Sequence, residues 1–150
     1  MASTVTPATA TVQIVESLTL GGVPRGATHT RTISNVAEAD RRVVTIPSAG
    51  EIDIIELNTA NGQGKFVGTA IKYIRITNLD DTNFVRVRFK KSGAETADLK
   101  VSAGASVMFS TNQMDADTAA GAFSAFVDLE LISAQADTAD VDIEYVVLAV

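Results

Sequence analysis

The sequence predicts an all-β protein, an antiparallel β-sandwich of jelly-roll-like type with a flexible N-terminal arm. Apolar and polar residues alternate along most of the chain, which is the period of a strand with one buried face. Turn signals built from Gly, Pro, Asn or Asp recur about every ten residues, a spacing typical of sandwiches and barrels. No stretch has the apolar spacing of a long helix. These observations predict roughly nine or ten short strands.

The composition indicates one domain with an aliphatic core. The chain has 150 residues, no cysteine, no tryptophan and 5% aromatic residues. Disulfides and thiolate metal sites are therefore excluded, and Val, Ile, Leu and Ala must fill the core. A domain of this length buries roughly two-thirds of the surface that its unfolded chain exposes. We expect residues 1–11, rich in Ser, Thr and Ala, to form the flexible arm and residues 12–150 to form a single sandwich domain.

The acidic charge balance narrows the choice of partner. Lys and Arg number 12 against 18 for Asp and Glu, which gives a formal net charge of −6. Nucleic-acid affinity comes mainly from Lys and Arg that neutralise phosphates, and anionic membranes attract basic segments. The N-terminus lacks the runs of a secretory signal, and no stretch reaches the roughly 20 apolar residues that span a bilayer. We expect a soluble protein made in the cytoplasm, with neither nucleic acid nor a membrane as partner.

The first half of the chain predicts five strands. Their alternating or β-branched runs cover residues 12–20, 28–36, 42–46, 52–57 and 71–77. Interruptions are expected at 21–24, 37–40, 47–50 and 58–64. The Pro47–Gly50 segment is the best defined of these turns, because Pro suits the first central position and Gly supplies a positive φ nearby.

The second half continues with a hairpin turn at Asn78–Asn83, where Asn and Asp side chains bond their own backbone. Beyond it, Val85, Val87 and Phe89 alternate with basic residues, so that strand has one buried and one basic face. Further strands are predicted at 99–101, 107–109, 126–132 and 141–150, with a polar loop at 114–121 that has room for one helical turn. The last strand is apolar on both faces, which indicates either a central strand or an edge covered by another subunit.

Burial in an oligomer is the preferred interpretation of that strand, because an exposed apolar edge would invite aggregation. The candidate subunit interface consists of Tyr145, Val146, Val147, Leu148 and Val150.

A basic row is the most distinctive charge feature and the candidate docking face for an acidic protein surface. It consists of Arg75, Arg86, Arg88 and Lys90. Internal pairing is the favoured alternative, with Asp128 and Glu130 or with Asp142 and Glu144, which face outward on other strands. Such cross-strand pairs contribute roughly 0.2–1 kcal/mol each.

The sequence predicts no catalytic, cofactor or metal site. His29, the single histidine, has no nucleophile motif beside it. The Gly62–Lys65 segment lacks the Ser or Thr that follows the lysine of a phosphate loop. Asp115, Asp117 and Gly121 lack the Glu that closes a calcium loop. Binding or assembly, rather than catalysis, is therefore expected.

Two segments carry a family resemblance. Residues 74–87, IRITNLDDTNFVRV, form a strand, an Asn/Asp turn and a second strand, and residues 98–107, DLKVSAGASV, lead through an Ala-Gly turn into the next strand. In this arrangement the stretch from Ile71 to Ser110, 40 of the 150 residues, resembles small structural proteins of tailed-bacteriophage particles.

The resemblance implies a virion protein on the capsid surface, and first of all a capsid decoration (cement) protein. Proteins of that kind commonly form trimers that clamp neighbouring capsid subunits. It implies self-association, expected as a homotrimer, with the major capsid protein as the second partner. The alternatives are a head-to-tail adaptor, tail or fibre-associated protein, and, from another class, a carbohydrate-binding β-sandwich. The last is disfavoured because sugar sites usually need an aromatic platform and the chain offers only two Tyr and six Phe, with no Trp.

Overall fold

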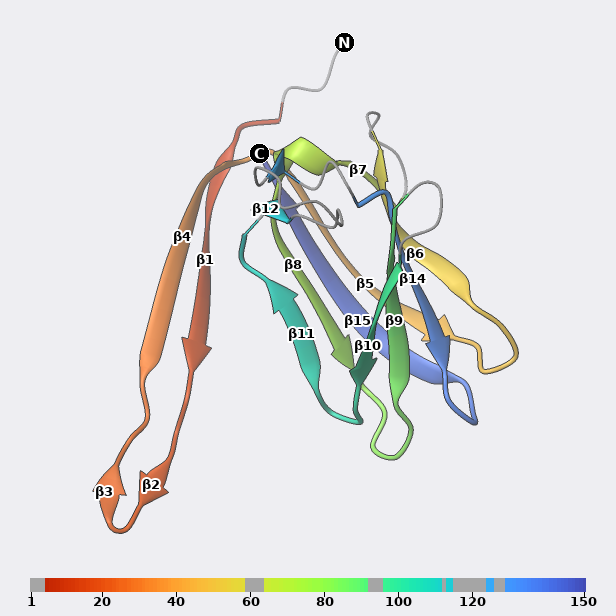
Figure 1. The fold of residues 1–150 in the computed structure, drawn as a ribbon. Coiled ribbons are helices and arrows are strands. Elements are labelled where there is room, and N and C mark those ends of the chain that lie inside the picture. The colour runs from red at the N-terminus through yellow and green to blue at the C-terminus, as the bar shows by residue number, and fades with distance from the viewer. Residues whose placement is uncertain (1–4, 59–63, 92–95, 112, 115–123, 126–128) are drawn as a thin grey trace. The chain divides into compact units, whose positions relative to one another are not determined.

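The computed structural model describes residues 5–58, 64–91, 96–111, 113–114, 124–125 and 129–150. Its contacts divide the chain into two compact units, Met1–Ala37 with Val150, and Glu38–Ala149. We call the hairpin at residues 8–36 the ribbon and the second unit the sandwich, and each is described by itself (Figure 1). The division falls after Ala37, and not between residues 11 and 12 as the sequence suggested, because the strands up to Val36 pair with one another.

The sandwich consists of a five-stranded sheet in the order β10-β9-β14-β6-β7 and a four-stranded sheet in the order β11-β8-β15-β5. Its strands are β5 (Glu38–Ile46), β6 (Ile52–Asn58), β7 (Lys65–Val67), β8 (Ile71–Asn78), β9 (Val85–Lys90), β10 (Thr96–Val101), β11 (Ser106–Phe109), β14 (Leu131–Ala136) and β15 (Val141–Ala149). A 3-10 turn, η1 (Gly68–Ala70), precedes β8, and β12 (Gln113–Met114) pairs with β13 (Ser124–Ala125). Pairing within the two sheets is antiparallel except between β6 and β7.

The strand order confirms the predicted jelly roll. When β5, β6, β8, β9, β10, β11, β14 and β15 are numbered 1 to 8 along the chain, the two sheets read 5-4-7-2 and 6-3-8-1. Each sheet thus joins strands that are distant in sequence, which is how two Greek keys interleave in a jelly roll.

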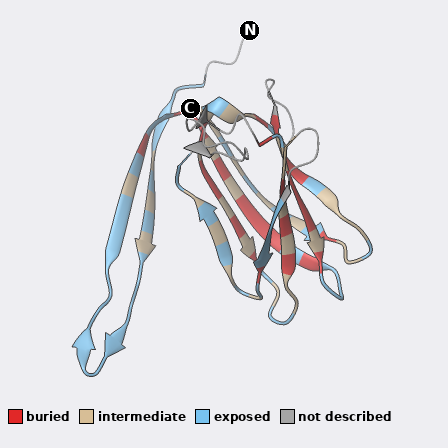
Figure 2. Ribbon diagram, viewed as in Figure 1, coloured by how far each residue is buried: buried red, intermediate tan, exposed pale blue. Residues whose placement is uncertain are grey.

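The core lies between the two sheets and is aliphatic, as the composition predicted (Figure 2). Ile74 and Ile76 of β8 face it from one sheet, and Val85 and Val87 of β9 face it from the other, all fully buried. The strict alternation of buried and half-buried residues along β9 follows from its one-faced burial, and β8 alternates in the same way from Ile74 to Asn78. Near one edge, the rings of Phe89 and Phe109 meet edge to face with centroids 5.3 Å apart.

Several predicted boundaries differ from the structure. The turn expected at residues 37–40 is wrong, because Glu38 to Asp40 already belong to β5 and pair with β15. The strand expected at 126–132 begins only at Leu131 and runs on to Ala136, while residues 126–128 lie outside the described part. Most of the loop expected at 114–121 also lies outside it, and Met114 is in β12.

The ribbon is a long antiparallel hairpin made of β1 (Ala8–Val15), β2 (Thr19–Leu20), β3 (Val23–Pro24) and β4 (Thr28–Val36). It includes residues 8–11, which the sequence assigned to the arm. The two paired stretches share one register, the first from Ala10–Ile33 to Val15–Thr28 and the second at Thr19–Pro24 and Leu20–Val23. Gly21 and Gly22 close the end with φ of 58° and 79°, as the two central positions of a type I′ turn require.

Candidate functional site

The basic row is divided between the two sheets. Arg86, Arg88 and Lys90 lie on the outer face of β9, in the five-stranded sheet, whereas Arg75 lies on β8 in the four-stranded sheet. The four side chains therefore do not form one continuous docking face.

On the five-stranded sheet, the carboxylate of Glu51 lies among all three cations of β9. Arg86 and Arg88 approach its Oε2 at 3.0 and 3.2 Å, and the ammonium of Lys90 pairs with its Oε1. The Ser133 hydroxyl donates to Oε1 at 2.9 Å. The hydrogen bond from Lys90, with that from Ser133 and the charges of Lys90 and Arg88, holds the pKa of Glu51 below its ordinary value.

Two further partners complete this network. Asp98 of β10 pairs with Arg88, and the Gln135 amide oxygen accepts from Arg86 at 2.7 Å. Internal pairing, the favoured prediction, is therefore found here, with Glu51 and Asp98 as partners. Of the two partners that the sequence suggested for this sheet, Asp128 lies outside the described residues and Glu130 is exposed. The sequence did not identify Glu51 as a partner, because it follows the Pro47–Gly50 turn, where alternation does not assign a residue to a strand face. Asp98 could be identified as a partner only from the pairing of β10 with β9.

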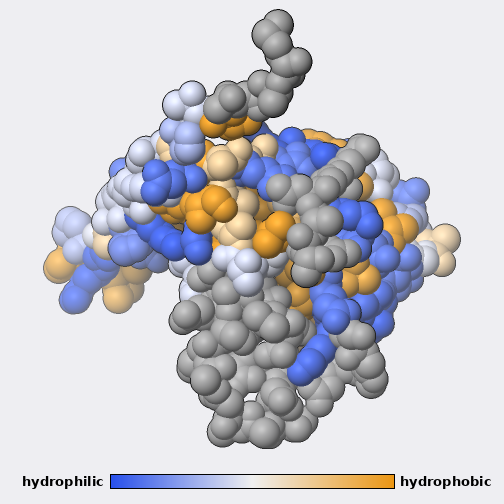
Figure 3. All heavy atoms as spheres, turned by 90° about the horizontal axis from the view of Figure 1, so that it is seen from above, coloured by the Kyte–Doolittle hydropathy of each residue, from blue (hydrophilic) through white to orange (hydrophobic). Residues whose placement is uncertain are grey.

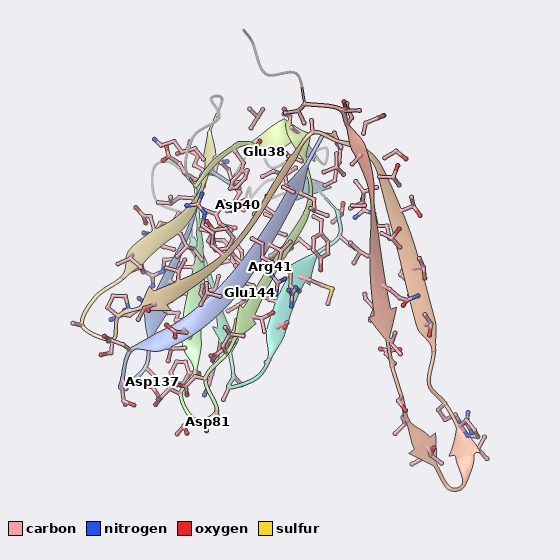
Figure 4. All side chains as sticks on the ribbon, turned by 180° about the vertical axis from the view of Figure 1, so that it is seen from behind. Glu38, Asp40, Arg41, Asp81, Asp137 and Glu144 are labelled. Carbon is pink, nitrogen blue, oxygen red and sulfur yellow. The ribbon has the colours of Figure 1, made fainter. Side chains whose placement is uncertain are left out.

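On the four-stranded sheet, Arg75 pairs with Glu144 of the neighbouring β15, as the sequence proposed. Arg41 of β5 reaches the same carboxylate from the other side, with Nε 2.7 Å from Oε2 (Figure 4). Glu144 is only 8% exposed. Hydrogen bonds from its two guanidinium partners lower the pKa of Glu144, and the bond from Arg41 has the larger effect.

Apolar side chains lie beside this triad on the outer face of the sheet. Val43 is 60% and Met108 39% exposed, and Val43 lies directly opposite Glu144 while Met108 lies opposite Arg75. Val146 and Leu148 of β15 share this outer face and are half-buried. The outer face of the four-stranded sheet thus carries exposed apolar side chains beside one self-paired charge cluster, whereas the outer face of β9 is ionic.

The candidate subunit interface on β15 requires a correction. β15 is a central strand between β8 and β5, the alternative that the sequence left open. Tyr145 and Val147 point into the protein's own core and are 1% and 0% exposed, so they are not available to a partner. Val146 and Leu148 lie on the outer face, and Val150 is 41% exposed. One apolar face of β15 therefore packs in the protein's own core, and the other lies on the partly exposed outer face of the sheet.

The edge strand β5 carries charges on its inner side. Asp40 and Arg42 pair at 2.9 Å, and the Tyr145 hydroxyl donates to Asp40 Oδ2 at 3.4 Å. Burial, reinforced by the neighbouring Asp40, raises the pKa of both Tyr145 and Glu38. Inward charges on an edge strand oppose pairing with another strand, so β5 is protected against uncontrolled edge-to-edge association.

The ribbon has an apolar and a polar side. The constant register places alternate residues of both strands on one side, and these are mostly apolar. They are Ala10, Val12, Ile14, Glu16, Leu18 and Leu20 with Val23, Arg25, Ala27, His29, Arg31 and Ile33. The opposite side is largely Thr, with Val15 as its one large apolar residue.

Exposure rises towards the free end of the ribbon (Figure 2). Ile33 near the base is 5% exposed, whereas Leu18, Leu20 and Val23 are 56%, 66% and 50% exposed. Figure 3 shows apolar atoms on the surface at this free end. Alternation in the sequence predicted the two long strands of the ribbon, but it could not show that the apolar residues near the turn are exposed.

The remaining sequence candidates are scattered. His29 is exposed on β4, and Lys65 pairs with Glu56 at 2.9 Å. Residues 59–63 and the acidic positions Asp115 and Asp117 lie outside the described part. Among the residues that the structure describes, no group of three His, Cys, Asp or Glu side chains is placed to hold a metal ion.

The described residues contain no helix that is long and apolar enough to cross a membrane. No family model matches the chain, and neither a curated protein nor a solved structure matches it.

Proposed function

We propose that this protein is a structural component of a tailed-phage particle, a decoration protein that binds the major capsid protein and stabilises the shell. It acts by burying surface between protein subunits and has no catalytic role. The ribbon carries this proposal: a two-stranded hairpin with exposed apolar side chains, joined to a sandwich that already has its own core.

A free two-stranded hairpin is marginally stable in water, and a sheet with one apolar face is stable when that face is covered. Leu18, Leu20 and Val23 are at least half exposed in the single chain. The surface of another molecule would cover them, and an apolar patch of this kind marks a protein–protein contact.

The sandwich supports the same role with a second surface. The outer face of the four-stranded sheet exposes Val43 and Met108 around the triad of Arg41, Glu144 and Arg75. A molecule with two separate contact surfaces is suited to bridging neighbours, which is what a cement protein does. The phage particle itself enters the proposal through the resemblance of residues 71–110 to virion proteins.

Rebinding to stripped particles tests the proposal. Particles of the encoding phage are treated with a chaotrope until this protein is released, and the purified protein is then added back and located by immunogold electron microscopy. Saturable binding to heads supports the decoration role. Labelling confined to tails or to the head–tail junction would replace it with the adaptor or tail alternative, and absence from intact particles would overturn the virion role.

The ribbon's part in that binding has a matched pair of variants. Leu20 and Thr19 are adjacent and exposed, and they lie on opposite sides of the ribbon. Leu20→Asp should weaken rebinding, because it places a charge on the apolar side, whereas Thr19→Asp should not. Equal rebinding by both variants would remove the ribbon from the contact.

A further inference from the structure

We propose that the ribbons of two copies pack against each other through their apolar sides, in opposite directions, about a two-fold axis that passes between the levels of Glu16 and Arg25. This inference rests on the assembly role proposed above: a second copy of this chain covers the apolar side of the ribbon, and the ribbon contributes to shell binding by joining two copies.

Backbone hydrogen bonds show which residues of the two strands of the ribbon lie side by side, and we call each such pair of residues a level. Glu16 N donates to Ala27 O, and Arg25 N donates to Leu18 O, both at 2.8 Å. Glu16 and Ala27 therefore share one level, and Leu18 and Arg25 share the next level towards the turn. Both pairs continue the register of the strands on either side of them, and from this continuity we infer that their side chains lie on the apolar side.

The open part of the apolar side is the half towards the turn. Glu16, Leu18, Leu20, Val23 and Arg25 are all exposed there. Ile33 near the base is buried within the chain, so the base is not available to a partner. A contact between two ribbons must therefore use their outer halves.

The charge pattern of this outer half is complementary to that of a second copy lying in the opposite direction. It carries one carboxylate, Glu16, and one guanidinium, Arg25, on adjacent levels. In the part of the chain that the structure describes, neither side chain has an ion-pair partner. When a second ribbon lies over the first in the opposite direction, the Glu16 level of each copy meets the Arg25 level of the other. The contact then contains two Glu16–Arg25 pairs, one on each side of the axis.

The same two-fold axis also brings apolar residues of one copy over apolar residues of the other. It places the level of Leu20 and Val23 over the level of Ile14 in the other copy, so the most exposed apolar residues become covered. Packing in the same direction would instead set Glu16 against Glu16 and Arg25 against Arg25. Like charges in such positions oppose association, and the charge pattern therefore selects the antiparallel arrangement.

Charge reversal with mixing tests the contact without any phage particle. The wild-type mass by light scattering behind a sizing column should approach twice 15.7 kDa as concentration rises. Glu16→Arg alone and Arg25→Glu alone each set like charges together twice, and each should raise the dimer dissociation constant by at least about tenfold. An equimolar mixture of the two variants should recover the dimer, because both pairs become attractive between unlike chains.

The chain offers a control and a second rescue. The double variant Glu16→Arg with Arg25→Glu should dimerise by itself. Thr32→Arg, a charge on the exposed polar side of β4, should leave the mass unchanged. Wild-type protein that stays monomeric, or that forms trimers, would overturn the two-fold contact, as would a mixture of single variants that stays monomeric. None of these results depends on binding to a capsid, so they leave the proposed virion role to its own test.

Discussion

Arg88 of β9 and Asp98 of β10 lie directly opposite each other and form a two-point ion pair. Arg88 Nε donates to Oδ1 at 2.7 Å and Nη2 donates to Oδ2 at 2.8 Å. The pair joins the edge strand β10 to its neighbour on the outer face of the five-stranded sheet. It also lowers the pKa of Asp98, mainly through the hydrogen bond from Arg88.

Reversing two charges of β9 tests whether the basic row is internal. Arg86→Glu with Arg88→Glu would place two carboxylates beside Glu51 and Asp98. We expect the melting temperature, followed by circular dichroism at neutral pH and low salt, to fall by several degrees. Adding Asp98→Arg should recover part of the loss. An unchanged melting temperature together with lost particle binding would instead make the row a docking face.

Acid should destabilise the sandwich through its paired carboxylates. The folded-state pKa values of Glu51 and Glu144 lie below the ordinary 4.5, because basic partners bind the ionised forms. A depressed folded pKa contributes stability above the ordinary value that is lost as pH falls through the folded value. Glu38 acts in the opposite sense, because burial raises its pKa.

The urea midpoint measured at pH 7, 5, 4 and 3 checks this expectation. It should stay nearly level down to about pH 5 and then decline as Glu51 and Glu144 protonate. The variant Glu51→Gln with Glu144→Gln should begin from a lower midpoint and decline less. If the variant and the wild type lose stability in parallel, these two carboxylates do not account for the acid sensitivity.

Asn78 stabilises the hairpin between β8 and β9 from a buried position, with 1% of its surface exposed. Its Nδ2 donates to Asn83 O at 2.9 Å and to Val101 O at 3.1 Å, and its Oδ1 accepts from Asp80 N at 3.0 Å. Asn78→Ala leaves these backbone groups unpaired and should cost roughly 2–3 kcal/mol of unfolding free energy. Asp81→Ala in the exposed part of the same turn should change stability by less than about 0.5 kcal/mol. Similar effects of both changes in urea titrations would argue against this role.

Val147 and Leu148 are neighbours in β15 that point to opposite faces of the sheet, Val147 into the core and Leu148 outward. Val147 is fully buried, so Val147→Ala should lower the unfolding free energy by roughly 2 kcal/mol through lost transfer energy and the cavity that it leaves. Leu148→Ala, on the half-buried outer face, should cost clearly less. Light scattering of Val147→Ala should match the wild type. A changed oligomer mass without lost stability would return Val147 to a subunit interface.

The parts of the fold that were predictable depend on local periodicity. Alternation along residues 71–77 and 85–90 identified β8 and β9 and their buried faces, and the Asn/Asp turn between them was visible in residue type alone. These features depend on neighbours in the chain, because a strand with one buried face must alternate wherever its partners lie.

The features that were missed depend on pairing between distant segments. The apolar run of β15 has the same composition whether its second face meets another subunit or the same sheet, and only the strand order shows that it is central. Glu51 became the partner of three cations because β9 lies within its reach, which no spacing encodes. The ribbon alternates like a sandwich strand, since alternation reports that one side is apolar and not what covers it.

The connection between the ribbon and the sandwich has a mechanical consequence. Only Ala37 separates β4 from β5, and β5 is paired with β15 along all nine of its residues. A pull on the ribbon therefore has almost no slack to take up before it reaches the sheet. Tension along β5 would load its hydrogen bonds to β15 together, in shear, so they would share the force instead of breaking one after another. A molecule tethered by its ribbon would transmit strain directly into a central strand of its sandwich.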